Sequence, residues 1–473
     1  WRVFLPNNYK DFKTKVNVIK PISKSGAIIF FPYQSPVMFQ GVDQLQTDLG
    51  TKVTIGDGGL FNQPLQNIVN SDLSNEYGSS ESMRGVINTP VGVFYISQAQ
   101  GKIFHYTGKL DNIANKGMKQ WFNKYLPSIL VRQFPELEQS PLSDNPVVGV
   151  GCQAVYDPNY DIVYFTKKDY KLKDQYAGCV DGRPINIKVP QECVSFENNQ
   201  FIYYPLSGGE IPIEIGDPIF FEDASWTVSY DPKTGSWISF HDWHPELVMP
   251  SINHFFTTKT NPDLNATDRG GIWRHNATCQ LYANYYGEDY PWEVEIIENT
   301  GQNVMTLRSI EYQLESYIYT GDLLNGCGDD RFHDLDYNFD QAIIHNSEQV
   351  SGLLMLDPHP KEDPYAMIQY PQVGFNDIRI LYSKEEQKFR FNQFYDITND
   401  RGEFTAAQQS IFNTEVNGYI RNLNILNLNY NKEEIQHKKF RHYYNKVILR
   451  RMRSGNRKML MKLANTKLNL SYR

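Results

Sequence analysis

Short segments in which apolar and polar residues alternate recur along most of the chain. Their apolar positions are mainly aromatic or β-branched, which is typical of half-buried β-strands. Several segments are separated by only a few turn-forming residues, and this arrangement predicts β-hairpins. The four clearest pairs are residues 93–97 with 102–106, 154–156 with 162–165, 226–230 with 236–240, and 378–382 with 388–391.

The turns between these segments contain residues that favour tight reversals of the chain. Asp157 and Asp231 each precede a proline, and Gly235 can supply a positive φ angle. We predict two further hairpins, formed by residues 292–298 with 303–307 and by residues 447–453 with 457–463.

The hairpins recur at related distances along the chain. The turns at Asp157 and Asp231 are 74 residues apart, and the turn at Ser383 follows Asp231 by 152 residues. Such recurrence is typical of units that bury their apolar faces by stacking on one another. We therefore predict a mainly β fold of β-propeller-like blades with long insertions, a few short helices and a basic C-terminal arm or hairpin. Because the spacing exceeds the roughly 40–50 residues of an ordinary blade, a large β-sandwich is the alternative.

Helical patterns are found in residues 112–134, which are interrupted by two prolines, and in residues 433–445. The chain starts at Trp1, which indicates a processed or truncated beginning. We predict three segments: an extended N-terminal segment, 1–81, that continues a missing N-terminal part; a propeller-like β domain with insertions, 82–417; and a basic C-terminal helix and hairpin segment, 418–473.

Charge is distributed unevenly between the two ends of the chain. Residues 432–473 contain 13 Lys and Arg against two Glu, a net charge of +11, so residues 1–431 carry −19 of the total of −8. A basic end on an acidic body indicates a partner, either a nucleic acid or an acidic neighbouring subunit. These cations could line a DNA channel, or they could form a solvated face that contacts acidic neighbours. The candidate contact residues are Arg441, Lys446, Arg450, Arg451, Arg453, Arg457 and Lys458.

Residue types that bind metals do not form a recognisable motif. His241, Asp242 and His244 follow a predicted strand end, and we interpret them, with His254, as part of a surface turn. The aspartates of residues 329–336 lack the glycine and glutamate of an EF-hand loop. The five cysteines are widely spaced and odd in number, so we predict buried or free thiols. We predict no metal and no cofactor.

Residues 229–237, Ser-Tyr-Asp-Pro-Lys-Thr-Gly-Ser-Trp, resemble the Asp-box of sialidase propellers. In that family the box shapes a hairpin and carries no catalytic group. The common nucleotide-binding, metalloprotease and serine hydrolase signatures are not found in the sequence. We therefore predict a protein that is not an enzyme. The alternatives are a receptor-binding or glycan-degrading tail protein and a host-derived propeller scaffold.

Several longer stretches resemble the muzzle, or tail stabilisation, protein of crAss-like bacteriophages. They comprise residues 82–97 and 101–122, 217–226 and 239–246, 291–295 and 306–312, and 462–468. The resemblance implies a virion structural protein related to the nozzle of short-tailed phages. It implies a cyclic homo-oligomer below the tail hub that closes the DNA exit channel and opens for genome ejection. The implied partners are the tail hub or ring, other tail proteins and passing genomic DNA, and no membrane span is predicted.

Overall fold

The computed structural model divides the chain into two compact units, Trp1–Ala277 (unit 1) and Thr278–Arg473 (unit 2). The structure describes residues 9–22, 26–32, 34–40, 44–46, 52–54, 65–68, 78, 80–180, 183–184, 192–260, 270–275, 284–299, 301, 303–320, 330–333, 337–351, 354–358, 378–392, 394, 396, 439–451 and 459–471. The segment boundaries predicted after residues 81 and 417 stay a prediction.

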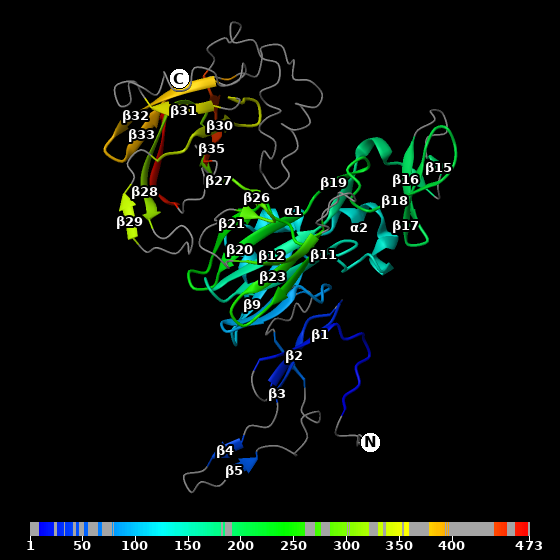
Figure 1. Ribbon diagram of the computed structural model, residues 1–473. Helices are drawn as coiled ribbons and strands as arrows, with labels where there is room; N and C mark the ends of the chain where they lie inside the picture. Colours follow the sequence, from blue (N-terminus) through cyan, green and yellow to red (C-terminus); the bar gives the residue numbers. More distant parts are fainter. Residues whose placement is uncertain are drawn as a thin grey trace. The chain divides into compact units, whose positions relative to one another are not determined.

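Unit 1 begins with small antiparallel sheets (Figure 1). One has the order β1-β2-β3-β6, with β1 (Val18–Pro21), β2 (Gly26–Phe30), β3 (Val37–Gln40) and β6 (Gln66–Asn67). A two-stranded sheet joins β4 (Gln44–Gln46) and β5 (Lys52–Thr54). The next has the order β10-β9-β8-β7, with β7 (Val86–Thr89), β8 (Gly92–Ser97), β9 (Lys102–Tyr106) and β10 (Leu110–Asn112). The β8–β9 pair is the first predicted hairpin, which is confirmed.

A four-stranded sheet with the order β11-β12-β20-β21 forms the centre of unit 1. Its strands are β11 (Gly151–Asp157), β12 (Ile162–Lys168), β20 (Trp226–Asp231) and β21 (Ser236–His241). The second and third predicted hairpins are confirmed as β11–β12 and β20–β21. They are joined to each other through β12 and β20, so they belong to one sheet and do not form separate blades.

The helices of unit 1 precede this central sheet in the chain. They are η4 (Ile113–Asn115), α1 (Lys119–Tyr125), α2 (Ile129–Gln133) and η5 (Pro135–Gln139), and η6 (Asp174–Tyr176) follows β12. The prediction of helix within residues 112–134 is confirmed. Phe122 of α1 is fully buried, and its ring lies 5.9 Å from that of Trp226 and 4.7 Å from that of Trp237. Edge-to-face and tilted contacts of this kind add to the hydrophobic energy of burial.

The remaining strands of unit 1 form short sheets. These are β13 (Tyr170–Leu172) with β19 (Phe221–Asp223), β14 (Cys179–Val180) with β15 (Arg183–Pro184), β16 (Cys193–Glu197) with β17 (Gln200–Tyr204) and β18 (Ile211–Ile213), and β22 (Leu247–Pro250) with β23 (Phe255–Thr260) and β24 (Gly270–Arg274).

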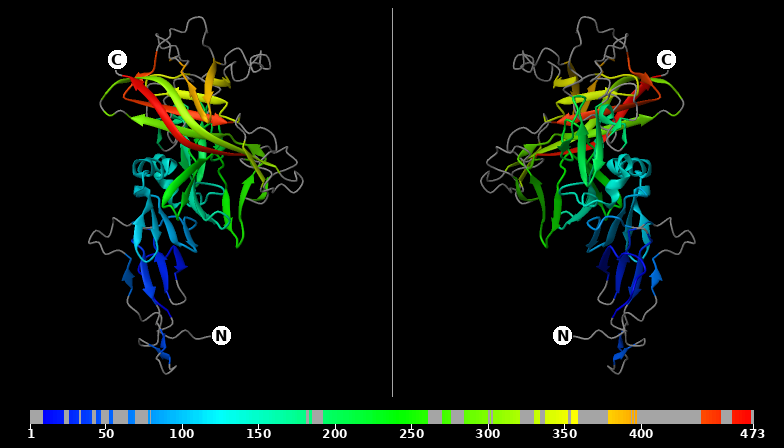
Figure 2. Two further views of the ribbon diagram at one scale, coloured as in Figure 1. Left: turned by 90° about the vertical axis from the view of Figure 1, so that its left-hand side faces the viewer. Right: turned by 90° about the vertical axis from the view of Figure 1, so that its right-hand side faces the viewer.

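Unit 2 is built around one sheet of ten strands. A separate pair joins β25 (Asn284–Tyr285) and β26 (Glu288–Asp289). The large sheet contains β27 (Trp292–Asn299), β28 (Met305–Thr320), β29 (Asp330–His333), β30 (Gln341–His345), β31 (Leu354–Pro358), β32 (Ile378–Glu385), β33 (Lys388–Phe391), β34 (Arg441–His442), β35 (Tyr444–Arg451) and β36 (Met459–Ser471). In Figure 2 the red strand β36 runs alongside the yellow-green strand β28, with which it pairs from Ser471 to Met459.

The strands of unit 2 confirm one predicted hairpin and correct two. The hairpin of residues 378–391 is confirmed as β32–β33. The other two predictions are wrong about pairing, because β27 and β28 do not pair with each other, and neither do β35 and β36. Instead β27 pairs with β35, and β28 pairs with β36. Local turns do not decide these pairings, because a strand with one apolar face pairs wherever that face is buried.

The mainly β prediction is confirmed, whereas propeller blades are not. The described part of residues 433–445 also corrects the helix predicted there, since residues 441–442 and 444–445 are in β34 and β35. Asn445 and Val447 are buried in this sheet.

Candidate functional site

The structure gathers part of the predicted basic site on one strand. Lys446, Arg450 and Arg451 lie in β35, and Arg441 lies in the neighbouring segment β34 with an exposed side chain. Arg453, Arg457 and Lys458 lie outside the described residues. The basic end of the chain is therefore part of a sheet at the positions that the structure describes.

Two cations of β35 form ion pairs with glutamates of β27. Arg450 Nε lies 2.7 Å from Glu293 Oε1, and Lys446 Nζ lies 3.5 Å from Glu295 Oε1. The Glu293 side chain is only 9% exposed, so this pair is shielded from water more than an ordinary surface ion pair.

Strand alternation produces this arrangement. Val294 and Ile296 of β27 pack on the core of unit 2, as do Val447 and Leu449 of β35. The charged residues between them point to the opposite face, where Glu293 lies directly across from Arg450. The alternating glutamates of residues 292–298 were the available sequence signal, but it becomes informative only when β27 is known to pair with β35.

Arg451 makes a different set of contacts. Its guanidinium donates to the Asn338 carbonyl at 3.1 Å and lies 3.7 Å from an Asp340 carboxylate oxygen. It also lies 4.3 Å from the centre of the Tyr337 ring, within the range of a cation–π contact. Three of the predicted site residues are thus engaged by unit 2 itself, which leaves less of their charge for an external partner.

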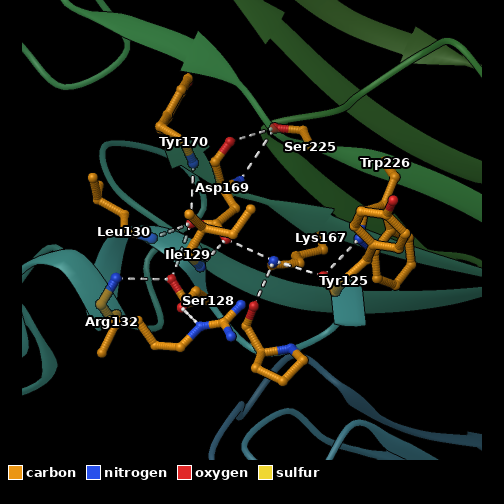
Figure 3. A network of polar contacts seen from close by, with 12 residues as sticks. Tyr125, Ser128, Ile129, Leu130, Arg132, Lys167, Asp169, Tyr170, Ser225 and Trp226 are labelled. Atoms are coloured by element: carbon orange, nitrogen blue, oxygen red, sulfur yellow. Dashed lines mark hydrogen bonds and ion pairs between the residues drawn. The ribbon is translucent and has the colours of Figure 1, made fainter. Parts of the chain in front are cut away.

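A second polar site, in unit 1, was not anticipated from the sequence (Figure 3). Lys167 Nζ and Asp169 Oδ2 are 2.6 Å apart, and both side chains are fully buried. Burial of an ion pair requires that further hydrogen bonds replace the lost water. The Lys167 ammonium donates to the carbonyls of Tyr125 at 2.7 Å and Pro127 at 3.0 Å.

Asp169 completes the network by binding the start of helix α2. Its carboxylate accepts from the Ser128 hydroxyl at 2.9 Å and from the backbone amides of Ile129 at 2.6 Å and Leu130 at 3.3 Å. These amides have no acceptor within the helix, so the carboxylate satisfies them. The ion pair therefore fastens the α1–α2 corner to the end of β12. The sequence signal was a lysine that continues the core-facing alternation of Val163 and Phe165.

The Asp-box segment forms the turn between β20 and β21. Asp231 accepts from the Lys233 amide at 2.7 Å and from the Thr234 hydroxyl at 2.9 Å, and its carbonyl accepts from the Gly235 amide. Gly235 has a φ of +69°. Trp237 donates from its indole nitrogen to the Ile113 carbonyl at 3.1 Å. The residues of the box are thus used in shaping the hairpin and in packing.

The histidines near the end of β21 are dispersed. Each imidazole has a different neighbour: His241 with Ser229 at 2.9 Å, His244 with Asp223 at 3.4 Å, and His254 with Asn159 at 3.2 Å. Trp243 between them is buried, which corrects the interpretation as a surface turn. Within the described ranges, no three His, Cys, Asp or Glu residues are grouped as metal ligands would be. The side chains of the acidic cluster in residues 329–336 lie outside those ranges.

The cysteine prediction is correct for one residue and wrong for another. Cys152 is a free thiol, fully buried in β11, and burial raises its pKa. Cys193, at the start of β16, takes part in a disulfide. Cysteine spacing in the sequence does not reveal which residues become neighbours in a β fold.

Together, the fold and these sites define a mainly β protein whose charged residues fasten its own strands and corners. Over residues 35–261 the chain matches the family model described as Crassvirus muzzle protein. This region belongs to that family, as the resemblance predicted, and the protein is a structural component of a phage virion tail. A search of curated proteins found no match. No helix in the described ranges is long and apolar enough to cross a membrane.

Proposed function

We propose that the protein assembles as a cyclic homo-oligomer that forms the distal muzzle ring of the tail. The ring closes the DNA exit channel, opens for genome ejection and catalyses no reaction. The observation that carries this proposal is the match of residues 35–261 to the muzzle family.

The polar network of unit 1 supports a mechanical role. A single ion pair, Lys167 with Asp169, holds two backbone carbonyls and the first turn of α2. Removing any one of these partners would leave a buried polar group unsatisfied, so the corner resists partial opening. Such rigidity suits a subunit that must keep its shape under pressure from packaged DNA.

The basic strand β35 supports DNA passage without tight binding. Phosphate contacts by free Lys and Arg strengthen binding without reading sequence, and each added contact slows release. Here Lys446 and Arg450 already lie beside Glu295 and Glu293. A channel wall with cations paired in this way would let DNA slide, whereas exposed Arg441 remains available to an acidic tail partner or a phosphate.

The test is the position of the chain on intact particles. A reconstruction of virions that carry a labelled chain should show a cyclic array at the distal end of the tail, around the channel axis. A single copy, or an array at another position, would contradict the proposal. Turnover of a glycan by the purified chain would favour a glycan-degrading tail protein instead.

A further inference from the structure

The large sheet of unit 2 is open and has two different edges. In the part of the chain that the structure describes, β27 forms a ladder with β35 alone, and β36 forms one with β28 alone. Edge strands present unpaired backbone groups that can bind a further strand. Each copy of unit 2 thus offers two strand-binding edges.

The edge strand β27 lacks the usual protection against pairing. Proteins commonly protect an edge with lysine, proline, a bulge or a very short strand. β27 has eight residues, none of them lysine or proline, and its ladder with β35 is regular. It exposes two large apolar side chains, Ile297 at 57% and Trp292 at 36%. Such a strand is suited to an interface.

The two edges are complementary in charge. β27 contains three glutamates and no basic residue, a net charge of −3. β36 contains two lysines and no acidic residue, a net charge of +2. Two copies of β27 would repel each other, and so would two copies of β36, whereas β27 and β36 attract.

The faces of the two strands also match. Val294 and Ile296 of β27 pack on the unit 2 core, and so do Leu468 and Leu470 of β36. Alternation places Glu293 and Glu295 on the other face of β27 and Lys467 on the other face of β36. Joining the edges with their apolar faces continuous therefore places glutamates beside a lysine.

The sheet already contains this combination within one chain. Glu311 of β28 lies across from Arg390 of β33 on one side and from Lys467 of β36 on the other. In β27, Glu293 lies across from Arg450 on one side, and the open edge is on its other side. A neighbouring β36 would complete the same cation–glutamate–cation row across three strands.

We propose that β27 of one copy pairs with β36 of the next copy, so that the large sheet continues from subunit to subunit. This inference rests on the ring in the proposed function and names the surface that would build it. The contact is head-to-tail, because each copy uses a different edge toward each neighbour, and such contacts close into rings when the rotation permits.

The test compares the full-length chain with three single variants by mass photometry. Ile297→Lys puts a cation on the β27 edge, and Lys467→Glu puts an anion on the β36 edge. Ile272→Lys is the matched control, because Ile272 is an isoleucine of similar exposure, 69%, on the edge strand β24 of unit 1. We expect the native chain and the control to form rings and both edge variants to lose them.

A mixture of the two edge variants distinguishes head-to-tail pairing from other contacts. Each variant retains one intact edge, so the mixture should form dimers that do not grow into rings. Rings in either edge variant, or loss of rings in the control, would overturn the edge pairing and leave the ring itself standing. A native chain that is monomeric both in solution and on particles would overturn the ring.

Folding is controlled by a second variant. Lys467→Glu combined with Glu311→Lys keeps opposite charges across β28 and β36 while still reversing the charge at the edge. It should melt like the native chain and remain unable to form rings. Ring formation by this double variant would overturn the edge pairing.

Discussion

Lys167 and Asp169, two residues apart on the same chain, form a fully buried ion pair with 2.6 Å between Nζ and Oδ2. Side chains two apart on a regular strand point to the same face, but Asp169 lies just beyond the end of β12. The carboxylate can therefore reach both the ammonium and the amides of Ile129 and Leu130. This geometry makes the pair the polar centre of unit 1.

We predict that Lys167→Met destabilises unit 1 by about 3–5 kcal/mol, because Asp169 would remain buried without its counter-ion. The measurement is the free energy of unfolding in urea. Lys233→Ala is the control, since Lys233 also pairs with an aspartate, Asp161, but is largely exposed, at 67%. The control should change little. Equal effects of the two substitutions would show that burial of the first pair is unimportant.

The stability of unit 1 should fall as the pH is lowered from about 6.5 toward 4. Burial lowers the pKa values of His241 and His275 from 6.5 to about 4, so both are neutral in the folded protein when the unfolded chain already binds protons. Their contribution is complete above pH 6.5 and is lost on acidification, by up to about 3 kcal/mol for each histidine.

Unfolding free energies measured at pH 8, 6 and 5 check this dependence. His275→Phe should reduce the slope, because the ring stacked on Phe255 would no longer titrate. It should also lower stability at pH 8, since the contact between His275 and the Thr257 hydroxyl is lost. An unchanged slope would contradict the assignment to His275.

Gly235→Ala should destabilise unit 1 by about 1 kcal/mol, because the residue has a φ of +69°. Space is not the limit there, since the nearest atom to an added Cβ is Lys116 Nζ at 3.4 Å. Gly271→Ala is the matched control, as its φ is outside the left-handed region and its surroundings are open. Thermal melting should separate the two variants, and equal melting temperatures would contradict the strain.

Arg450→Gln should lower the stability of unit 2 by about 1–2 kcal/mol, because Glu293 would keep its shielded position without its partner. Adding Glu293→Gln should recover part of the loss, and a double-mutant cycle on urea unfolding measures the coupling. The same variants in virions test DNA contact. If Arg450 serves only the sheet, particles with the double variant retain a normal DNA content.

A triple substitution that neutralises Arg450, Arg451 and Arg453 should alter particle assembly or the retention of packaged DNA. The measurement is particle yield together with DNA content per particle. Normal values of both would count against a DNA or partner role for this basic segment.

The hairpins could be predicted because their information is local. In the turn between β20 and β21, Asp231 and Gly235 fix the reversal, and the alternating residues on each side fix which face is buried. The same reasoning identified the helical corner before the central sheet. The family resemblance was found in the same region, where residues 35–261 match the muzzle family.

Pairing between distant segments could not be predicted in this way. The segments at residues 292–298 and 303–307 form strands, yet β27 pairs with β35, about 150 residues later in the chain. Likewise Lys167 was an ordinary lysine in the sequence until the fold placed Tyr125, Pro127 and Asp169 around it.

The sequence by itself therefore determined the β class, the local hairpins and the muzzle family, because these depend on alternation, turn residues and extended similarity. The tertiary structure decided which strands share a sheet, which cations are paired with glutamates and which edges of unit 2 stay open. These features depend on the burial of apolar faces and on charges that meet only after folding, and residues far apart in the chain supply both.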